Sequence, residues 1–379
     1  MKKFRIEKEH QRMKISQYLR EVQNYSGRSL RNVEVFLNGK QVRLTKKLPS
    51  HGNLRVIEKK KGTDIKPIKL PLDIIFEDED ILVVNKEPFL LTHPTQKKAD
   101  FTLANGIVNH FLEKYGEVRV PRFYNRLDMN TSGLIIIAKN SFAQAFLQNF
   151  SIFEKKYLAI VNGIIDDKEI ARINEELAKD GKKHKIQDLE KENLKPEIGK
   201  VNFGEMKKYD EMEKIENNLI FENKDNKIGE NRDFSSKKEN NNLNLKSKSN
   251  FENINFTINK IVIERRIFRD GDNLERIIDE QGQYAKTAVK VLKTYPEKNA
   301  TLVECELFTG RTHQIRVHLK SIGHTIVGDE LYGNGLNKEL GINRQFLHAY
   351  KVKFTHPASK KEVELEIPIF SDMKEFLEK

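Results

Sequence analysis

The sequence contains little cysteine and no long apolar run. Cys305 is the only cysteine among 379 residues, so the chain cannot form an internal disulfide framework. The N-terminal residues carry no apolar stretch of the signal-peptide or transmembrane type. We therefore expect a cytoplasmic protein, and we interpret Cys305, which lies in an alternating strand pattern, as a small buried apolar residue.

The usual motifs of cofactor and metal sites are also missing. The sequence has no glycine-rich phosphate loop and no regularly spaced set of Cys and His residues. His313 and His318 are separated by about 140° around a helix, unlike the pair one turn apart that shares a zinc ion. We therefore expect no metal at these histidines, and we interpret His313 as a hydrogen-bonded structural histidine.

Positive charge is concentrated at the start of the chain. The formal net charge is +12, and residues 1–70 hold 19 Lys and Arg against 6 Asp and Glu, which leaves 49 basic and 50 acidic residues for the rest. With 37% hydrophobic residues, the chain is long enough for two or three globular domains. A basic module joined to a neutral remainder suggests that the module binds a nucleic-acid backbone. A basic face can also serve only to keep a protein soluble.

Residues 1–58 are predicted to form a small basic module. Ser26 can cap the second of two short helices, and an Asn-Gly turn within residues 35–42 predicts a hairpin. This combination resembles an S4-type RNA-binding module. The resemblance implies that its basic side chains contact RNA, namely Arg20, Arg28, Arg31, Lys40 and Arg43. Residues 59–71 are predicted to be a charged linker.

Residues 72–379 are predicted to form a second domain, of the α+β class. The run Leu134–Ala138 is too short for a membrane span and too continuous for a half-exposed strand. It therefore predicts a central strand that is covered on both faces and entered sharply at Gly133. Residues 81–84 predict another buried strand, and residues 156–163 predict a strand that follows a helix. We expect a mixed, largely antiparallel sheet.

Residues 166–260 interrupt this pattern. They are rich in Lys, Glu and Asn, carry nearly balanced charge and show no sustained amphipathic period. Such a composition buries too little apolar area to offset the entropy of ordering. We therefore predict a low-complexity insertion that is largely disordered or a loosely helical surface segment. A folded accessory domain remains an alternative.

Two motifs carry the candidate chemistry. The first spans residues 126–133, Arg-Leu-Asp-Met-Asn-Thr-Ser-Gly, in which a nearby arginine favours the ionised form of Asp128. Taken alone, Asp128 is more simply explained as a turn aspartate that caps the local backbone. The second motif, residues 309–319, predicts a helix that is capped by Thr312 and aims Arg316 away from the core.

Together these segments resemble the RluA/RluC/RluD family of RNA pseudouridine synthases. The family signature is His-Arg-Leu-Asp-x-x-Thr-Ser-Gly-Leu, and this chain has Asn125 at its first position, which can still donate and accept hydrogen bonds. Where the family has a Lys-Pro-x-Gly turn, this chain has Glu87 and no glycine at positions 87–91, so we predict a differently built loop. The resemblance covers residues 15–57, 72–163 and 261–370.

The resemblance implies an isomerase that converts uridine in RNA to pseudouridine without a cofactor. Asp128 would be the catalytic carboxylate, Arg316 its buried ion partner, and Tyr157 would stack on the extruded base near C5. Arg126 would be a wedge or a phosphate contact, and Arg311 a phosphate or ion-pair residue. Asp128 could attack C1′ or remove a ribose proton, and the sequence leaves both routes open.

The S4-like module favours large-subunit (23S) ribosomal RNA as the substrate. Transfer RNA is one alternative, and a non-catalytic RNA-binding or ribosome-assembly protein is another. The intact set of Asp128, Tyr157 and Arg316 favours an enzyme over the latter. We expect a monomer that does not contact membranes.

Overall fold

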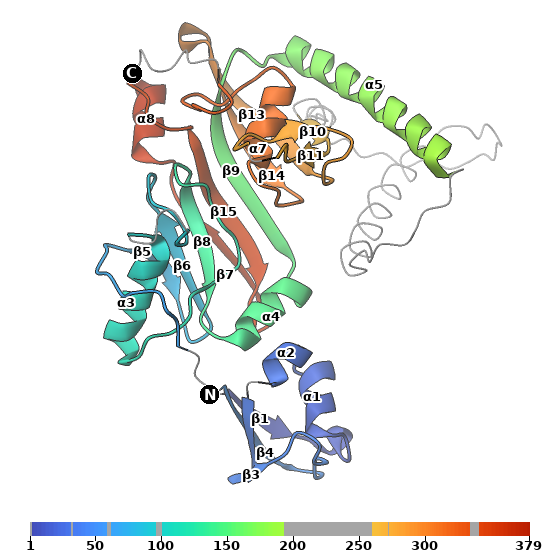
Figure 1. Ribbon diagram of the computed structural model, residues 1–379, viewed down its shortest axis with the longest axis vertical. Helices are drawn as coiled ribbons and strands as arrows, with labels where there is room; N and C mark the ends of the chain where they lie inside the picture. The colour runs from blue at the N-terminus through green and yellow to red at the C-terminus, as the bar shows by residue number, and fades with distance from the viewer. Residues whose placement is uncertain are drawn as a thin grey trace, which may run out of the picture. The chain divides into compact units, whose positions relative to one another are not determined.

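The computed structural model describes most of the chain outside the predicted insertion (Figure 1). The described ranges are 2–31, 33–58, 62–95, 101–192, 260–271, 273–333 and 341–379, with only the backbone described for Arg28 and for residues 181–192. Most of the predicted insertion, residues 193–259, therefore lies outside the described residues. No helix in the described ranges is both long and apolar enough to cross a lipid bilayer.

The first described segment contains a small antiparallel sheet and two short helices. Its strands are β1 (Lys2–Ile6), β2 (Val33–Leu37), β3 (Lys40–Val42) and β4 (Gly52–Glu58), in the order β1-β4-β2-β3, and its helices are α1 (Ile15–Glu21) and α2 (Gly27–Leu30). Ser26 Oγ accepts the Ser29 N–H at 3.0 Å, which caps α2. Asn38 and Gly39 both have positive φ, as the tight turn of the predicted hairpin between β2 and β3 requires.

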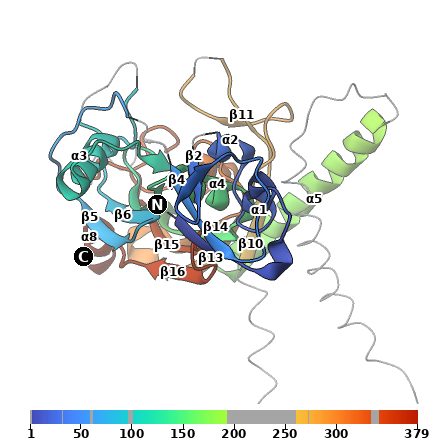
Figure 2. The same ribbon diagram turned by 90° about the horizontal axis from the view of Figure 1, so that it is seen from below.

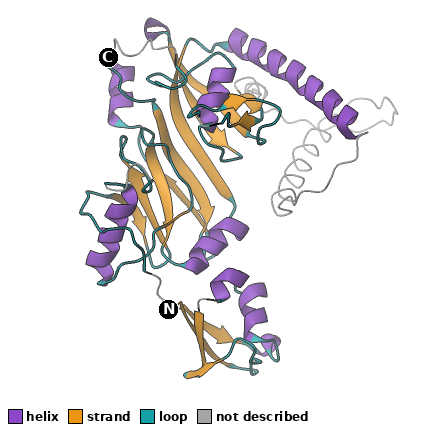
Figure 3. Ribbon diagram, viewed as in Figure 1, coloured by secondary structure: helices purple, strands orange, loops and turns teal. Residues whose placement is uncertain are grey.

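A ten-stranded mixed sheet forms the second part of the fold (Figure 3). Its strand order is β10-β13-β14-β9-β15-β8-β6-β5, with β16 paired to β15 and β7 paired to β8. Among the described strand pairs only β8 and β15 run parallel, so the predicted mixed, mostly antiparallel α+β fold is confirmed. The strands are β5 (Asp73–Glu77), β6 (Ile81–Lys86), β7 (Arg122–Phe123), β8 (Ser132–Ala138), β9 (Phe153–Asn162), β10 (Lys260–Glu264), β13 (Lys286–Tyr295), β14 (Ala300–Leu307), β15 (Leu347–Thr355) and β16 (Glu362–Glu366).

Helices and a small ribbon complete the described structure. The helices are α3 (Leu103–Tyr115), α4 (Ser141–Phe150), α5 (Asp167–Glu192), α7 (Gln314–Ser321) and α8 (Ser371–Glu378), and the ribbon pairs β11 (Ile267–Phe268) with β12 (Ile277–Ile278). Two views place α3 beside β5 and β6 (Figures 1 and 2). Its apolar side chains share a core cluster with those of β6, which fixes this helix against the sheet.

Strand β8 is covered on both faces, as its continuous apolar sequence predicts. All of its residues are buried, with Ile135 in one core cluster and Ile136 in another on the opposite face. Burying side chains of this size contributes about 1.5 to 3 kcal/mol each. At the start of the strand Gly133 has φ +116°, and a Cβ there would lie 2.3 Å from the carbonyl oxygen of Ala349 on β15. Glycine is therefore required where the chain enters the sheet.

The start of the predicted insertion is a regular helix. Helix α5 begins at Asp167, and its first turns bury Ile170 and Ile173 in the main core cluster. These two side chains lie three positions apart on one face. Because the sequence that follows is strongly polar, this short apolar contact is hard to detect from periodicity.

Candidate active site

The side chain of Asn125 extends the pairing between β7 and β8. Its Oδ1 accepts the N–H of Ile136 at 2.9 Å, and its Nδ2 donates to the carbonyl oxygen of Leu134 at 3.1 Å. The side-chain amide thus makes the two hydrogen bonds that a backbone residue would make in an antiparallel strand pair. The first position of the Asn-Arg-Leu-Asp sequence therefore anchors the turn that follows it to the central strand.

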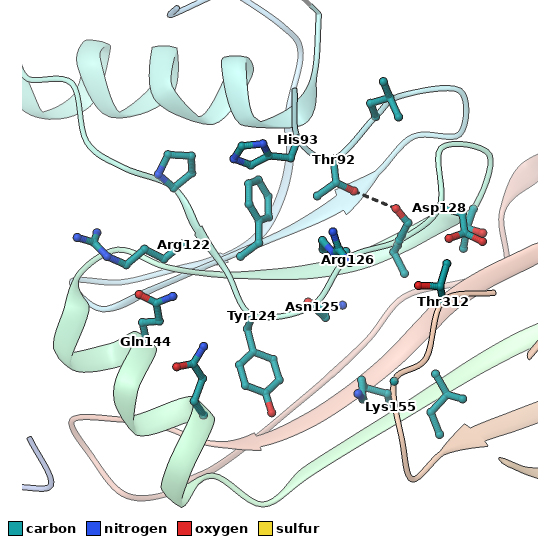
Figure 4. A pocket seen from close by; sticks show the side chains of 18 of the residues that line it. Thr92, His93, Arg122, Tyr124, Asn125, Arg126, Asp128, Gln144, Lys155 and Thr312 are labelled. Atoms are coloured by element: carbon teal, nitrogen blue, oxygen red, sulfur yellow. Dashed lines mark hydrogen bonds between the residues drawn. The ribbon is translucent and has the colours of Figure 1, made fainter. Parts of the chain in front are cut away.

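The turn that carries Asp128 is held by side chains from three other segments. The carbonyl oxygens of Leu127, Met129 and Asn130 accept hydrogen bonds from Thr92 Oγ1 at 3.0 Å, Lys86 Nζ at 2.9 Å and Arg344 Nη1 at 3.3 Å. Figure 4 shows the first of these bonds as a dashed line. A backbone fixed at carbonyl groups on both sides of Asp128 holds its side chain in one direction.

Lys86 is a buried cation that binds carbonyl groups. It is 1% exposed, and its Nζ also donates to the carbonyl oxygens of Glu87 at 2.7 Å and Leu90 at 3.0 Å. Burial, assisted by the positive charge of Arg344, lowers the pKa of Lys86 to about 7. The loop beyond it contains Phe89 with φ +62°, so a left-handed residue is present there although the sequence has no glycine.

Asp128, Arg316 and Asp329 form a line of alternating charge. Arg316 Nη1 donates to Asp128 Oδ2 at 3.1 Å, and its Nε and Nη2 donate to the two oxygens of Asp329 at 2.7 Å each. The side chains are 31%, 8% and 0% exposed in the order Asp128, Arg316, Asp329. Burial disfavours the charge of Arg316, but the bonds to Asp329 and the charge of Asp128 outweigh it and raise the pKa of the guanidinium.

Helix α7 presents Arg316, although it begins differently from our prediction. Thr312 is not the N-cap; His313 occupies that position with φ +57° and makes no capping bond from its side chain. The preceding turn is instead fixed by Gln314, whose Oε1 accepts the Arg311 N–H at 2.9 Å. Gly323 follows the helix with φ +88°, a left-handed residue of the kind that commonly ends helices.

Tyr157 belongs to β9, which lies between β14 and β15 in the sheet. Its side chain is almost fully buried and lines the same pocket as Asp128. Burial, and to a lesser degree the negative charge of Asp128, raises the pKa of the Tyr157 phenol. The hydroxyl therefore keeps its proton at neutral pH.

One pocket of about 1220 Å³ contains the five residues that the sequence predicts near the reaction. Asp128, Tyr157, Arg316, Arg126 and Arg311 all line it. Figure 4 shows Arg122, Tyr124 and Gln144 at one end and Asp128 and Thr312 at the other. Arg126 is exposed, and Arg311 Nε donates to the carbonyl oxygen of Tyr284 at 3.0 Å. The volume exceeds what a single small ligand needs.

The predicted RNA contacts of the first segment lie outside this pocket. The side chains of Arg20, Arg31, Lys40 and Arg43 are exposed, and none of them lines the pocket. The side chain of Arg28 lies outside the described residues. The structure thus separates the predicted site residues into an enclosed group around Asp128 and a set of surface cations.

Sequence reasoning missed several residues of the site. Asp329 was not singled out by the sequence, because its bidentate contact with Arg316 is a tertiary one. Lys86 and Thr92 contact the Asp128 turn from distant segments. The available signal was Lys86 two residues after the apolar run 81–84, because a lysine at the end of a buried strand needs a partner.

The histidines of this region bind neighbouring polar groups. His318 contacts Thr287 Oγ1 at 2.9 Å, and burial lowers its pKa to about 4. His324 contacts Glu169 at 3.0 Å, and His313 contacts Tyr332, as a hydrogen-bonded structural histidine would. Within the described ranges no three His, Cys, Asp or Glu side chains converge on a point that could hold a metal ion.

The comparisons with known proteins agree on one family. Residues 80–321 match the family described as RNA pseudouridylate synthase, which is more than half of the chain. The chain is 29% identical to an uncharacterised RNA pseudouridine synthase, YhcT, of Bacillus subtilis, over 84% of this chain and 75% of that protein. It is 28% identical to the ribosomal large subunit pseudouridine synthase D of Zymomonas mobilis, over 81% of this chain and 72% of that protein.

A solved structure with a related name shows a looser match. The human RNA pseudouridylate synthase domain containing 1 protein aligns with a TM-score of 0.44 at 20% identity, over 79% of this chain and 83% of that one. The family assignment depends on the sequence match over residues 80–321. The chain therefore belongs to the RNA pseudouridylate synthase family, in the RluA/RluD group, and is an isomerase that acts on uridine in RNA.

Proposed function

We propose that this enzyme isomerises specific uridines of large-subunit ribosomal RNA and that Asp128 is its catalytic carboxylate. The observation that carries this proposal is the Arg316–Asp128 contact at 3.1 Å inside the large pocket. Arg316 is itself held by the fully buried Asp329, so its guanidinium cannot swing away from the carboxylate. Asp128 is 31% exposed and can reach a substrate.

The reaction exchanges one bond to the ribose for another. The bond between N1 of uracil and C1′ breaks, the base turns, and C5 bonds to C1′ while its hydrogen leaves and N1 gains a proton. Asp128 can act by attack on C1′ or by removal of a ribose proton, and both routes begin with an ionised carboxylate. The guanidinium of Arg316 holds that carboxylate in place, because its Nη1 donates to Asp128 Oδ2 at 3.1 Å.

Tyr157 is proposed to hold the uracil ring during this exchange. Its ring lines the pocket, and its raised phenol pKa keeps the side chain neutral. A neutral aromatic face suits stacking with a base that has left its helix. Extrusion of the base costs a few kcal/mol, and the exposed Arg126 is proposed to contact the RNA at the vacated position or at a phosphate.

The choice of ribosomal RNA is supported by the relatives and by the first segment. Relatives from Zymomonas mobilis and Neisseria meningitidis are named ribosomal large subunit pseudouridine synthase D. The sheet and helices of residues 2–58 carry exposed arginine and lysine side chains, which is consistent with an S4-like module that binds the phosphate backbone. A ribosomal substrate would place the reaction in the cytoplasm, with the chain acting as a monomer.

The test is carbodiimide mapping of pseudouridine in total RNA from cells that lack the protein. These cells are complemented with the intact chain or with Asp128→Asn, which keeps the shape of the side chain but removes its charge. We expect one or a few large-subunit sites to be lost in the mutant cells and restored by the intact chain alone. Loss confined to transfer RNA would contradict the ribosomal assignment, and restoration by Asp128→Asn would contradict the role of the carboxylate.

A further inference from the structure

The surroundings of His313 determine which of its ring nitrogens carries the proton. The hydroxyl oxygen of the buried Tyr332 lies 2.8 Å from the backbone nitrogen of Arg276 and 2.8 Å from Nδ1 of His313. The backbone N–H can only donate, and the described residues offer the phenol no acceptor other than the imidazole. The phenol therefore donates to Nδ1, and the neutral ring carries its proton on Nε2.

The protonated nitrogen lies near Asp128. His313 Nε2 lies 3.9 Å from Asp128 Oδ2, the same oxygen that accepts from Arg316 at 3.1 Å. Two donors are thus gathered around Oδ2, whereas Oδ1 has no hydrogen-bond donor among the described residues. The two oxygens of the carboxylate are therefore not equivalent.

Burial keeps the imidazole in its neutral state. It lowers the pKa of His313 against the opposing effect of the Asp128 charge. The charged groups that face the ring are Asp128, Arg316, Arg276 and Asp329. The effect of burial favours a neutral ring with a single N–H at neutral pH over a doubly protonated ring.

The backbone of His313 is strained in a way that supports this arrangement. Its φ of +57° lies in the left-handed region, which costs a residue with a Cβ of the order of 1 kcal/mol or more. In this conformation the ring packs edge-on against Tyr332, with ring centroids 5.6 Å apart. Residues that keep such strain are concentrated at functional sites, because surrounding contacts must maintain them.

We propose that His313 and Tyr332 are positioning residues that select the reactive oxygen of Asp128. Tyr332 orients the imidazole, the Nε2–H of His313 and the guanidinium of Arg316 hold Oδ2, and Oδ1 is left to react with the ribose. On RNA binding the separation of Nε2 and Oδ2 shortens to hydrogen-bond length. His313 keeps its proton throughout and forms no bond to the substrate. The inference rests on the proposed role of Asp128 in catalysis.

The test compares three variants in a single-turnover assay. The substrate is ribosomal RNA labelled with tritium at C5 of uridine and purified from cells that lack the protein, because C5 loses its hydrogen when it bonds to C1′. Tyr332→Phe removes the hydroxyl but keeps a ring over Arg316 at about the present 4.8 Å. His313→Asn tolerates the left-handed backbone but is too short to reach Asp128, whereas His313→Gln keeps a donor and an acceptor.

We expect the rate constant to fall about tenfold or more in Tyr332→Phe and His313→Asn, with unchanged affinity for the RNA. His313→Gln should recover part of this loss, which a purely structural role would not predict. Rates within twofold of the wild type in both impaired variants would overturn the inference. So would an equal loss in His313→Gln and His313→Asn.

A second measurement does not depend on the substrate. Nitrogen chemical shifts of protein labelled with ¹⁵N-histidine should show His313 as the Nε2–H tautomer, with the signal assigned by its absence in His313→Asn. An Nδ1–H tautomer would overturn the inference even if the enzyme is active. If the wild-type chain releases no tritium while Asp128→Asn behaves identically, the proposed function itself fails and the roles assigned toward that reaction fail with it.

Discussion

Arg316 binds two carboxylates, the fully buried Asp329 and the partly exposed Asp128. Its replacement should therefore affect stability and activity separately. Replacement with methionine leaves the fully buried Asp329 without its partner, so we expect the free energy of unfolding to fall by about 3 to 5 kcal/mol. It also leaves Asp128 without its donor, so activity should fall by at least a hundredfold. Urea denaturation and tritium release measure the two effects.

The control for this prediction is the double variant Arg316→Met with Asp329→Asn. Neutral asparagine removes the unpaired buried charge while keeping an acceptor for the N–H of Leu331. Stability should recover by at least half, and activity should not recover. Recovery of both would mean that Arg316 acts only through the stability of the fold.

Asn125 allows a second prediction at the scale of one residue. Asn125→Asp keeps the acceptor for the Ile136 N–H, but its carboxylate cannot donate to the carbonyl oxygen of Leu134. We expect a loss of about 1 to 3 kcal/mol in thermal unfolding. Asn125→His retains one donor and one acceptor, so it should lose less than about 1 kcal/mol. Equal losses in the two variants would contradict the role of the amide in the β7–β8 pairing.

Some residues of the site could be predicted from the sequence, and others could not, for a physical reason. Asp128, Tyr157 and Arg316 stand in motifs whose local pattern can be recognised, and the structure places all three around one pocket. Their catalytic roles stay predictions. Asp329 and Lys86 depend on contacts between segments far apart in the chain, and no local pattern records such contacts.

At the scale of elements, the short apolar runs were more informative than the caps. The run Leu134–Ala138 correctly predicts a central buried strand because only a strand covered on both faces is apolar at consecutive positions. The prediction that Thr312 is the N-cap was wrong. His313 occupies that position with a left-handed backbone, which the usual preference for threonine at N-caps does not predict. The loop after Lys86 likewise contains a left-handed Phe89 in place of a glycine.

Lys86 at the end of β6 makes stability depend on pH. Its pKa is lowered to about 7 in the folded state, whereas an unfolded lysine titrates near its ordinary value of 10.5. Between these values the unfolded chain binds more protons, so the free energy of unfolding contributed by Lys86 should rise with pH, by up to about 1.4 kcal/mol per pH unit. Below pH 7 both states are protonated and the slope disappears.

The measurement is urea denaturation of the wild type and Lys86→Met from pH 6 to pH 10. Methionine is nearly isosteric and does not titrate, and it cannot donate to the carbonyl oxygens of Leu90 and Met129. The stability of the wild type relative to Lys86→Met should therefore be lowest at pH 6, where the buried lysine is charged. This relative stability should increase as pH rises above 7. A constant difference over this range would show that Lys86 stays charged in the fold, with a pKa that is not lowered.

At the scale of the whole molecule, composition and strand order differ in what the sequence can predict. The basic surplus of residues 1–70 coincides with the small sheet of β1–β4, and the strand order of the larger sheet could not have been predicted. β15 lies between β8 and β9 although it follows them by more than a hundred residues. Only tertiary packing determines such a position in the sheet. The domain division at residues 58 and 72 stays a prediction.

Surface charge on the first segment should govern RNA affinity and leave the chemical step unchanged. We expect alanine at Arg20, Arg31, Lys40 and Arg43 to weaken binding of ribosomal RNA. For each phosphate that the variant no longer binds, the slope of log affinity against log salt should decrease by about 0.7 to 0.9. Because these side chains lie outside the pocket, the rate of tritium release at saturating RNA should stay within twofold of the wild type.

The matched control removes the same charge from other exposed positions. Lys168, Lys361, Lys374 and Lys379 are exposed outside the first segment, so the control variant carries alanine at these four positions. If binding depends on net charge alone, both sets should weaken it equally, since long-range attraction does not distinguish the positions. A decrease in affinity and salt slope confined to the first set would instead locate the phosphate contacts on residues 2–58, as an S4-like module requires.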